Sequence, residues 1–363
     1  MNRRLFVRSA ATLGVGSALT LVGHAQDGPG NADLVTPDAQ AAIDAGLAKL
    51  TALQAADGGY TDRTGFGNVA VTGLAGLALL AGGHHPGRGK YGRAVAKAAE
   101  YVAAKGNGRR PGYLQNADAF THGAMYQHGF GTLFLAEVCG TFPSADRQGR
   151  MRDVLEKAVA LTVKSQNRDG GWRYDPQPTG ADVSVTVAQL MALRAAKNAG
   201  VYVDKSVVDK SVEYIKGCRL SDGGYSYQKG QPGSGSLFPR SAAAVVGLFS
   251  AGIYDGHPDY ARYVAGGLKY LMRFRPGRPA GNFGGNRGGN HFWYGHYYAA
   301  LAMWTAGKPY WTDWFPAIRG ELLALQTLGT GWTDPDNNGT AYATAMACII
   351  LQLPNNYLPI MQK

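Results

Sequence analysis

Cysteine, charge and long apolar runs are all scarce in this chain of 363 residues. The three cysteines, Cys139, Cys218 and Cys348, lie far apart without a Cys-x-x-Cys pair, which excludes a disulfide framework and a zinc ribbon and leaves buried thiols. No stretch after residue 25 approaches about 18 unbroken apolar residues, so we expect no transmembrane anchor. Charged residues make up 17% and hydrophobic residues 45%, a balance that excludes general disorder and supplies a large core.

What is present begins with a segment that has the features of a signal peptide, residues 1–25. It carries three arginines, then an uncharged stretch, and it ends in Gly-His-Ala, a small-x-small cleavage pattern. Residues 2–8, Asn-Arg-Arg-Leu-Phe-Val-Arg, resemble a twin-arginine export signal, and the general secretion pathway is the alternative route. We therefore predict an exported protein, periplasmic or extracellular, in which residues 26–36 form a flexible leader.

Glycine is abundant, with 52 residues, and it recurs in a turn of the form Asp-Gly-Gly-aromatic. A repeat of about 50 residues that appears six times is typical of a repeat protein. Complete copies of the turn are Asp57-Gly58-Gly59-Tyr60, Asp169-Gly170-Gly171-Trp172 and Asp222-Gly223-Gly224-Tyr225, and degenerate copies lie at 111–113, 281–283 and 329–332.

A one-faced helical pattern precedes each turn, and a segment that is apolar on most faces follows it. The apolar segments are 69–80, 123–138, 183–196, 241–250, 294–304 and 342–351. Six amphipathic helices alternating with six buried ones predict an all-α protein, an (α/α)6 toroid of six helix-hairpin repeats over residues 37–363. The alternative is an open solenoid, which needs polar capping repeats, whereas this chain ends on apolar residues.

The repeat also resembles a known one. Outer-helix segments that end in leucine and glutamine lead into Gly-x-aromatic, as in 50–60, 161–172 and 325–332, and this resembles the repeat of the squalene cyclase and protein prenyltransferase superfamily. The resemblance covers the chain from about residue 36 to its end. Residues 122–130 and 182–193 resemble most closely the secreted prenyltransferase/squalene-oxidase-repeat proteins of bacteria such as planctomycetes. It implies a toroid with a pocket at its mouth, in a group with no settled reaction.

The two catalytic patterns of the superfamily are missing. Triterpene cyclases of this type carry Asp-x-Asp-Asp-Thr, and the matching residues 182–186 place Ser184 at the proton donor and Val185 at the second carboxyl. A serine hydroxyl is far too weak an acid to protonate an alkene. Prenyltransferases hold zinc with an Asp-x-Cys pair, and here no cysteine has an aspartate two residues before it. Both reactions are therefore disfavoured.

Polar residues at the starts of the inner helices are the candidates for a functional site, because equivalent positions of successive repeats face one axis. The catalytic candidates are His122, Asp182, His296, Tyr294 and Arg240, and the ligand-binding candidates are His128, Tyr126, His291, Trp293 and Tyr297. A structural role for the histidines at these helix starts, and core packing for the aromatic run 291–298, are the competing interpretations. We predict that His122, Asp182 and His296 meet at one end of one cavity.

No metal or cofactor is predicted. A zinc site from His122, His128, His296 and Asp182 lacks a close ligand pair. Residues 334–339 match the first half of an EF-hand loop, but Ala345 stands where a glutamate is required, so an Asx-rich turn that caps the next helix is the better interpretation. No phosphate-binding loop, Gly-x-Ser-x-Gly elbow or nucleic-acid motif is present, and we expect no nucleic-acid partner.

Three functions stay open. The first is a toroid that binds an apolar, isoprenoid-like or peptide ligand in its mouth. The second is a polysaccharide lyase or hydrolase, in which Arg240 would neutralise an acidic glycan and Tyr294 or His296 would move protons. Without the signal the formal charge falls from +11 to +8, since three arginines and no acid are removed, and this charge favours anionic partners. The third is an interaction scaffold with no catalytic activity.

Overall fold

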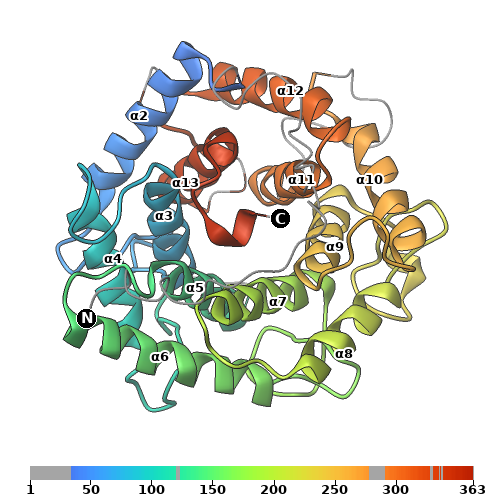
Figure 1. The fold of residues 1–363 in the computed structure, drawn as a ribbon, viewed down its shortest axis with the longest axis horizontal. Helices are drawn as coiled ribbons and strands as arrows, with labels where there is room; N and C mark the ends of the chain where they lie inside the picture. The colour runs from blue at the N-terminus through green and yellow to red at the C-terminus, as the bar shows by residue number, and fades with distance from the viewer. Residues whose placement is uncertain are drawn as a thin grey trace, which may run out of the picture.

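The computed structural model describes residues 34–119, 123–277, 291–327, 330–334, 336 and 338–362. Within these residues, helices alternate along the chain between an outer and an inner ring (Figure 1). The outer helices are α2 (Pro37–Leu53), α4 (Gly92–Lys105), α6 (Ala145–Lys164), α8 (Lys205–Lys216), α10 (Gly266–Leu271) and α12 (Tyr310–Leu325). The inner helices are α3 (Val69–Ala81), α5 (Ala124–Val138), α7 (Val183–Asn198), α9 (Phe238–Ser250), α11 (Phe292–Ala306) and α13 (Thr340–Gln352).

The two rings bury their helices to different degrees. The outer helix α8 starts at the N-cap Asp204, whose side chain accepts a hydrogen bond from the Ser206 N–H at 2.8 Å, and it buries only one face. The inner helix α3 buries every residue except Ala70. Removing an apolar side chain such as leucine from water stabilises the fold by about 1.5 to 3 kcal/mol, so the inner ring contributes most of the core.

Each repeat is joined to the next by its turn. Gly58 and Gly170 have φ of +94° and +95°, and a Cβ on them would lie 2.3 Å and 2.1 Å from a backbone oxygen of the next outer helix. Only glycine fits there. The Gln54 amide donates to the Gly58 carbonyl at 3.0 Å and to the Ala94 carbonyl of α4 at 2.9 Å, and Gln166 repeats this pattern with Gly170 and α8.

The ring closes through the same contacts. Gln326, at the end of α12, donates to the Ala42 carbonyl of α2 at 3.1 Å, so the sixth repeat binds the first as the first binds the second. In the inner ring, the Gln352 amide of α13 donates to the Ala78 carbonyl of α3 at 3.0 Å. Helix α13 also packs on both α2 and α3. The predicted (α/α)6 toroid is confirmed, and the open solenoid is excluded.

A second repeated contact fixes each turn to its own inner helix. The backbone N–H of the turn aromatic donates to a hydroxyl four or five residues after the helix N-cap. The pairs are Tyr60 with Thr72, Trp172 with Thr186, Tyr225 with Ser241 and Trp332 with Thr344. In the second repeat the acceptor is His128, whose Nδ1 takes the Leu114 N–H at 3.3 Å.

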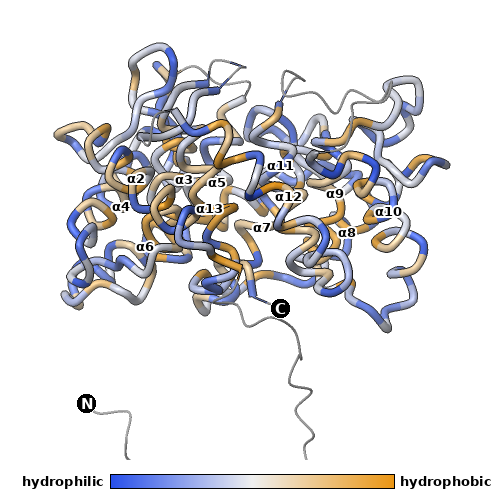
Figure 2. Tube along the Cα trace, turned by 90° about the horizontal axis from the view of Figure 1, so that it is seen from above, coloured by the Kyte–Doolittle hydropathy of each residue, from blue (hydrophilic) through white to orange (hydrophobic). Residues whose placement is uncertain are grey.

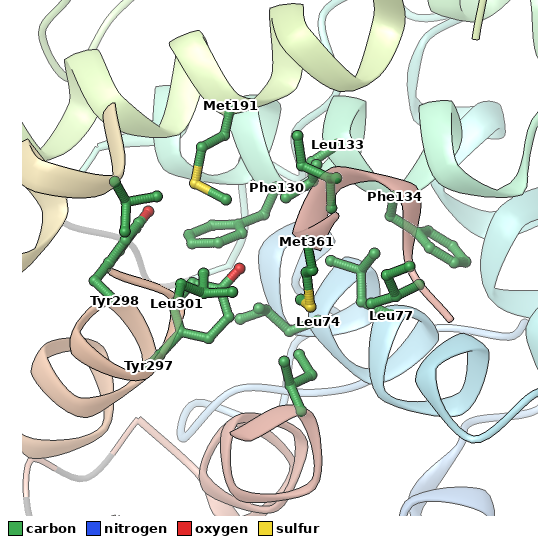
Figure 3. Close-up of a cluster of buried hydrophobic side chains, with 14 of the residues drawn as sticks. Leu74, Leu77, Phe130, Leu133, Phe134, Met191, Tyr297, Tyr298, Leu301 and Met361 are labelled. Carbon is green, nitrogen blue, oxygen red and sulfur yellow. The ribbon is translucent and has the colours of Figure 1, made fainter. Parts of the chain in front are cut away.

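The centre of the inner ring is filled by side chains. Phe130, Met191 and Leu301 meet there from α5, α7 and α11 and are at most 5% exposed (Figure 3). The C-terminal residues 353–362, here called the plug, turn back to the axis and bring Met361 beside Leu74 (Figures 1 and 3). Buried side chains therefore pack across the ring centre at this depth.

The plug closes the end of the ring at which the inner helices end. Trp304, near the end of α11, donates through Nε1 to the Met361 carbonyl at 2.9 Å. The Ile360 N–H donates to Glu137 of α5 at 3.4 Å, and Arg194 of α7 donates to the Gln362 carbonyl at 3.3 Å. Figure 2 shows the C-terminus at one side of the ring. The opposite end, where the inner helices start, is called the mouth below.

The start of the toroid requires a correction. Residues 1–33, with the predicted signal peptide and most of the leader, lie outside the described residues. Residues 34–36, which we assigned to the flexible leader, are instead attached to the ring: the Leu34 carbonyl accepts a hydrogen bond from Arg319 at 2.6 Å, and Thr36 is the N-cap of α2. Among the helices described, none is long and apolar enough to cross a membrane.

Candidate functional site

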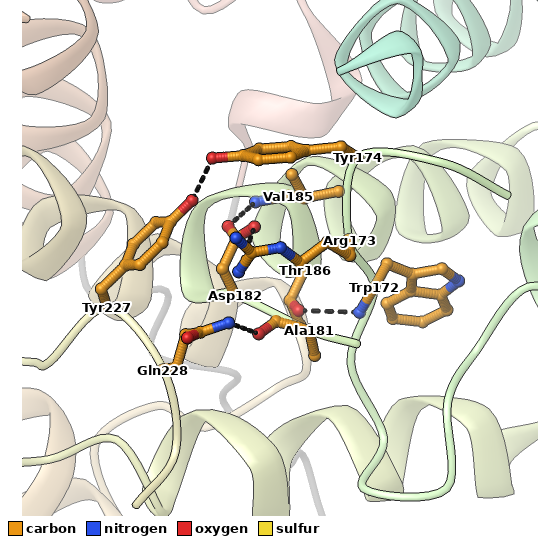
Figure 4. A network of polar contacts seen from close by, with 9 residues as sticks. All are labelled: Trp172, Arg173, Tyr174, Ala181, Asp182, Val185, Thr186, Tyr227 and Gln228. Atoms are coloured by element: carbon orange, nitrogen blue, oxygen red, sulfur yellow. Dashed lines mark hydrogen bonds and ion pairs between the residues drawn. The ribbon is translucent and has the colours of Figure 1, made fainter. Parts of the chain in front are cut away.

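Asp182 is the buried acid of the mouth. It is the N-cap of α7, where its Oδ1 accepts the Val185 N–H at 2.9 Å and its own N–H donates to the Trp172 carbonyl (Figure 4). Its side chain is 0% exposed, and its second oxygen, Oδ2, has no hydrogen-bond partner at ordinary geometry. The nearest cation is Arg173, with Nη1 at 3.9 Å from Oδ2.

The environment of Asp182 changes its acidity. Burial raises the pKa of the carboxyl from 3.8 to about 6, and the Val185 N–H, the Arg173 charge, the Tyr227 hydroxyl and the Ser184 N–H offset only part of this rise. A carboxyl with such a pKa exchanges its proton near neutral pH, which is the range that general acids and bases require. Asp182 is therefore the acid of the described mouth residues best suited to proton transfer.

Two tyrosines lie beside this carboxyl. Tyr174 and Tyr227 precede α7 and α9, and their phenol oxygens form a hydrogen bond with each other (Figure 4). Their backbones hold them in place: the Tyr174 carbonyl accepts the Met125 N–H at 2.9 Å, and the Tyr227 carbonyl accepts the Val183 N–H at 3.0 Å. Each loop thus caps the inner helix of the preceding repeat, and the phenol positions are fixed by the ring itself.

Two arginines lie over the Tyr227 ring, and one of them also lies over the Tyr174 ring. The Arg173 guanidinium carbon lies 4.7 Å from the centre of the Tyr174 ring and 5.5 Å from that of Tyr227. Arg240, which the sequence predicted for the mouth, lies 5.9 Å from the centre of the Tyr227 ring. Arg240 is almost completely buried and is held by the carbonyls of Ser234 and Gly235 at 2.7 Å and 3.0 Å.

Ser184 lies between two further phenols. Burial raises the pKa of Tyr126 and of Tyr294 well above 10, and the Ser184 hydroxyl beside them offsets a small part of this rise. Each of these two tyrosines also interacts electrostatically with Asp182. The structure therefore brings together side chains from α5, α7, α9, α11 and two loops. We call this set the mouth cluster: Tyr126, Arg173, Tyr174, Asp182, Ser184, Tyr227, Arg240 and Tyr294.

The structure does not bring His296 to Asp182. The imidazole lies in an aromatic cage, with ring centres 4.5 Å from Phe292, 5.0 Å from Phe238 and 6.1 Å from Trp314 of the outer ring. Burial lowers its pKa to about 3, so it is neutral at physiological pH. Since Thr344 and His128 occupy the same distance from their N-caps, His296 stands at the position that fixes the turn in other repeats. The predicted convergence of His296 with Asp182 was wrong.

His128 likewise has a structural place. Its Nδ1 accepts the Leu114 N–H, and its Nε2 forms a hydrogen bond of 2.9 Å with the Thr162 hydroxyl of α6. Burial lowers its pKa to about 4. Both ring nitrogens are occupied inside the protein, so His128 is not available to a ligand as we predicted. His122, the third histidine of that group, lies outside the described residues.

Three other predicted ligand residues lie apart from the mouth cluster. Trp293 is buried and donates through Nε1 to the Thr333 carbonyl at 3.1 Å. Tyr297 is fully buried at the ring centre, 6.4 Å from Phe130 between ring centres. His291 is exposed at the start of α11 with φ of +69°, and its backbone N–H donates to Asp336. The Trp293 and Tyr297 side chains therefore belong to the core, as in the competing interpretation of the aromatic run 291–298.

The sequence reasoning missed Arg173, Tyr174 and Tyr227. The sequence contains a pattern that could have identified both tyrosines. Each stands two residues after the aromatic of a complete turn, in Trp172-Arg-Tyr174 and Tyr225-Ser-Tyr227. Equivalent positions of neighbouring repeats must reach the same end of the axis.

Metal ligation is absent where the structure allows it to be assessed. Across the described ranges, no group of three or more His, Cys, Asp and Glu side chains is placed to hold a metal ion. Asp334 forms the predicted Asx turn instead: it accepts hydrogen bonds from the Asp336 N–H at 3.2 Å and from the Asn338 N–H at 2.7 Å.

Comparison with known proteins identifies the fold. The type II terpene cyclase MstE from Scytonema, in complex with geranylgeranyl dihydroxybenzoate, aligns with a TM-score of 0.58 and 13% identity over 88% of this chain and 98% of its own. An α-1,6-mannanase from Salegentibacter, in complex with α-1,6-mannotetrose, aligns with a TM-score of 0.65 and 8% identity over 89% and 100%. A protein from Actinoplanes aligns with a TM-score of 0.52 and 16% identity over 88% and 99%.

No family model and no curated protein matches the sequence. The chain has a squalene cyclase-like (α/α)6 repeat fold, as its repeats predicted. At these identities the likeness establishes the fold alone. The similarity to the secreted planctomycete-type proteins stays a prediction.

Proposed function

We propose that this protein is an exported, squalene cyclase-like toroid that binds a ligand at its mouth. The observation that carries the proposal is a pair of buried polar atoms in the mouth cluster, Asp182 Oδ2 and the Tyr294 hydroxyl, which make no hydrogen bond of ordinary geometry with a described residue, although the Tyr227 and Ser184 hydroxyls lie beside them. Leaving such a group unpaired costs about 1 to 3 kcal/mol, so a site that retains several of them gains when a ligand pairs with them. Export follows from the signal-like first 25 residues.

Polyene cyclisation by the mechanism of the superfamily fits this mouth poorly. Ser184 stands where the proton donor would be, and it contacts phenols rather than a second carboxyl. Beneath it, Phe130 and Met191 fill the ring centre, which leaves little room for a long apolar chain. The converging hydroxyls of the mouth cluster favour a ligand that is itself rich in oxygen.

Two of the similar structures hold ligands of different chemistry. MstE binds geranylgeranyl dihydroxybenzoate, and the mannanase binds an α-1,6-mannose oligosaccharide. For this chain we favour a saccharide, because tyrosine faces and hydroxyls together suit sugar rings better than a polyene. An isoprenoid or peptide ligand is the competing outcome.

A second candidate function is a lyase that acts on an acidic glycan. It is favoured by Arg173 and Arg240, which place two cations on the Tyr227 ring beside the carboxyl of Asp182. Asp182, with a pKa of about 6, would be the base, while burial raises the pKa of the phenols and so leaves them as proton donors. Asp182 thus takes the role of base that the sequence predicted for Tyr294 or His296.

Binding is tested by titrating the mature protein with α-1,6-mannotetrose, oligogalacturonate and geranylgeranyl dihydroxybenzoate. At about pH 5, where the Asp182 carboxyl is protonated and can donate a hydrogen bond, Asp182→Ala should weaken the binding of a mouth ligand by about 1 to 3 kcal/mol, and the outer-ring control Lys157→Ala should change it by less than about 0.5 kcal/mol. Asp182→Asn keeps the helix cap and separates binding from folding. Equal effects of Asp182→Ala and Lys157→Ala on every ligand would contradict the proposal and favour the interaction scaffold.

The lyase is tested separately. Pectate, alginate and chondroitin are incubated with the protein while the absorbance of unsaturated products is followed. Cleavage that disappears in Asp182→Asn supports it. If none of the three substrates yields unsaturated products, the lyase function is excluded and the binding proposal is unaffected.

A further inference from the structure

Hydrogen-bond donors without partners outnumber acceptors in the mouth cluster. Arg173 Nη1, Arg240 Nε and the Tyr294 hydroxyl are buried, and none has a hydrogen-bond partner in the part of the chain that the structure describes. Asp182 Oδ2 is a buried acceptor of the cluster that also lacks a hydrogen-bond partner. It lies 3.9 Å from Arg173 Nη1, which is beyond hydrogen-bond distance. The missing partner must bring more acceptors than donors.

We propose that the mouth binds an oxyanion, a carboxylate or sulfate carried on a saccharide, between Arg173 and Arg240 at the edge of Tyr227. This rests on the proposed function, since it names the ligand class of the same site. The guanidinium fork presents parallel N–H groups that match the two oxygens of such an anion.

The arginines are held so that these N–H groups stay free. Each guanidinium carbon lies over the Tyr227 ring, at 5.5 Å from its centre for Arg173 and 5.9 Å for Arg240, and a cation–π contact of this kind does not use the N–H groups as hydrogen-bond donors. Arg240 is anchored by Nη2 to two backbone carbonyls, which leaves Nε unpaired. A site positioned in this way loses little side-chain entropy when the anion binds.

A saccharide would also contact the tyrosine rings and the hydroxyls of the mouth cluster. The Tyr126 and Tyr174 rings lie 6.3 Å apart between centres, and the hydroxyls of Ser184 and Tyr294 are beside them. Sugar hydroxyls would pair with these hydroxyls while the apolar face of the sugar ring packs on a tyrosine. A polyene would leave every one of these donors unpaired.

Asp182 couples the binding to protons. The charged and titratable groups that face it are Arg173, Tyr126, Tyr227, Tyr294, Tyr214 and Cys218. Burial raises the pKa of each phenol above its usual value and that of the thiol to about 12, so these groups keep their protons at neutral pH. The Asp182 carboxyl, with a pKa of about 6, repels an anion when ionised and donates to it when protonated. An acidic saccharide should therefore bind more tightly as the pH falls through 6.

The test is calorimetric titration of the mature protein with three probes of similar size: oligogalacturonate, a sulfated galactan oligosaccharide and neutral α-1,6-mannotetrose. The charged probes should bind at least tenfold more tightly than the neutral one, and the better of the two distinguishes carboxylate from sulfate. Arg173→Gln should lower the affinity for the charged probe at least tenfold more than it lowers that for the neutral probe. Arg150→Gln on the exposed side of α6 is the matched control for lost charge.

Each of the other outcomes of this titration would contradict a stated part of the proposal. Arg173 is partly exposed, and its Nη1 has no hydrogen-bond partner among the described residues, so Arg173→Gln should fold, and its melting temperature verifies this. Equal affinity for charged and neutral probes, with both lost in Asp182→Ala, would overturn the oxyanion and keep the proposed function. Binding that survives Asp182→Ala and Arg173→Gln alike would overturn both. No measurable binding of either charged probe would also overturn the oxyanion. Charged-probe affinity that is equal at about pH 5 and about pH 8 would contradict the role of Asp182.

Discussion

Each end of the ring contains a buried carboxyl, and the two carboxyls differ in their hydrogen bonding. At the plug, Glu137 accepts the Ile360 N–H, and the neighbouring carbonyls of the plug take hydrogen bonds from Trp304 and Arg194. At the mouth, Asp182 lies as deeply buried, yet Oδ2 has no hydrogen-bond partner among the described residues, and neither have Nη1 of the neighbouring Arg173 and Nε of Arg240 in the same cluster. Burial raises the pKa of both acids, to about 7 for Glu137 and about 6 for Asp182.

This difference indicates that the two ends of the ring have different roles. At the plug end the chain supplies partners for Glu137 and for the Met361 and Gln362 carbonyls, so these polar groups contribute to stability. At the mouth it leaves polar groups unpaired and lowers its own stability, which is typical of a site whose partner comes from outside. The predictions below separate these two roles.

The largest effect is expected at the plug. Met361→Ala removes a buried side chain that packs beside Leu74, and it should lower the free energy of unfolding by about 2 to 5 kcal/mol. Ligand affinity at the mouth should not change. Chemical denaturation measures the loss, with the exposed Tyr357→Ala of the same segment as a control within about 0.5 kcal/mol. A parallel loss of affinity in Met361→Ala would show that the two ends are not independent.

The pH dependence of stability comes next. Because the folded pKa of Asp182 is raised from 3.8 to about 6, its contribution to stability is full below the unfolded value and is lost as the pH rises through 6. Between about pH 4 and pH 7 the wild type should lose about 2 to 3 kcal/mol relative to Asp182→Asn, which keeps the cap and does not titrate. Glu137 and the buried histidines titrate in both proteins and cancel. Parallel stability curves would contradict the raised pKa.

A smaller effect is expected at His128. His128→Ala leaves the Leu114 N–H without its acceptor and Thr162 without its imidazole partner, and it should cost about 2 kcal/mol of unfolding free energy. Binding and any activity should persist, since this imidazole fixes a turn. An intact fold with abolished binding would restore His128 to the functional residues.

Ring closure gives the smallest change. Gln326→Ala removes the hydrogen bond to the Ala42 carbonyl and should lower stability by about 1 kcal/mol, whereas Gln40→Ala on the exposed face of α2 should have a smaller effect. Hydrogen exchange should report faster opening of α2 and α12 together in Gln326→Ala. Faster exchange in α12 alone would indicate that the first and last repeats are not coupled.

The fold was predictable from the sequence because the repeat imposes it. The Asp-Gly-Gly turns and the apolar segments located the inner helices to within a few residues, as for α3 and α7. The site was less predictable, since a residue near a helix start faces the axis at one position and the outer ring a few residues later. Asp182 and His296 differ in this way. Tyr227 was missed because it lies in a loop, where its direction depends on the neighbouring repeat.

The most direct test of the central claim is a crystal structure of the mature protein with oligogalacturonate. We predict electron density for the saccharide over Ser184, with an acidic group within hydrogen-bond distance of Arg173 and a hydroxyl on Tyr294. The same density should be absent from crystals of Asp182→Ala grown under the same conditions. A ligand bound to the outer ring, or a mouth cluster that holds only water at saturating ligand, would contradict the claim that this end of the toroid is the functional site.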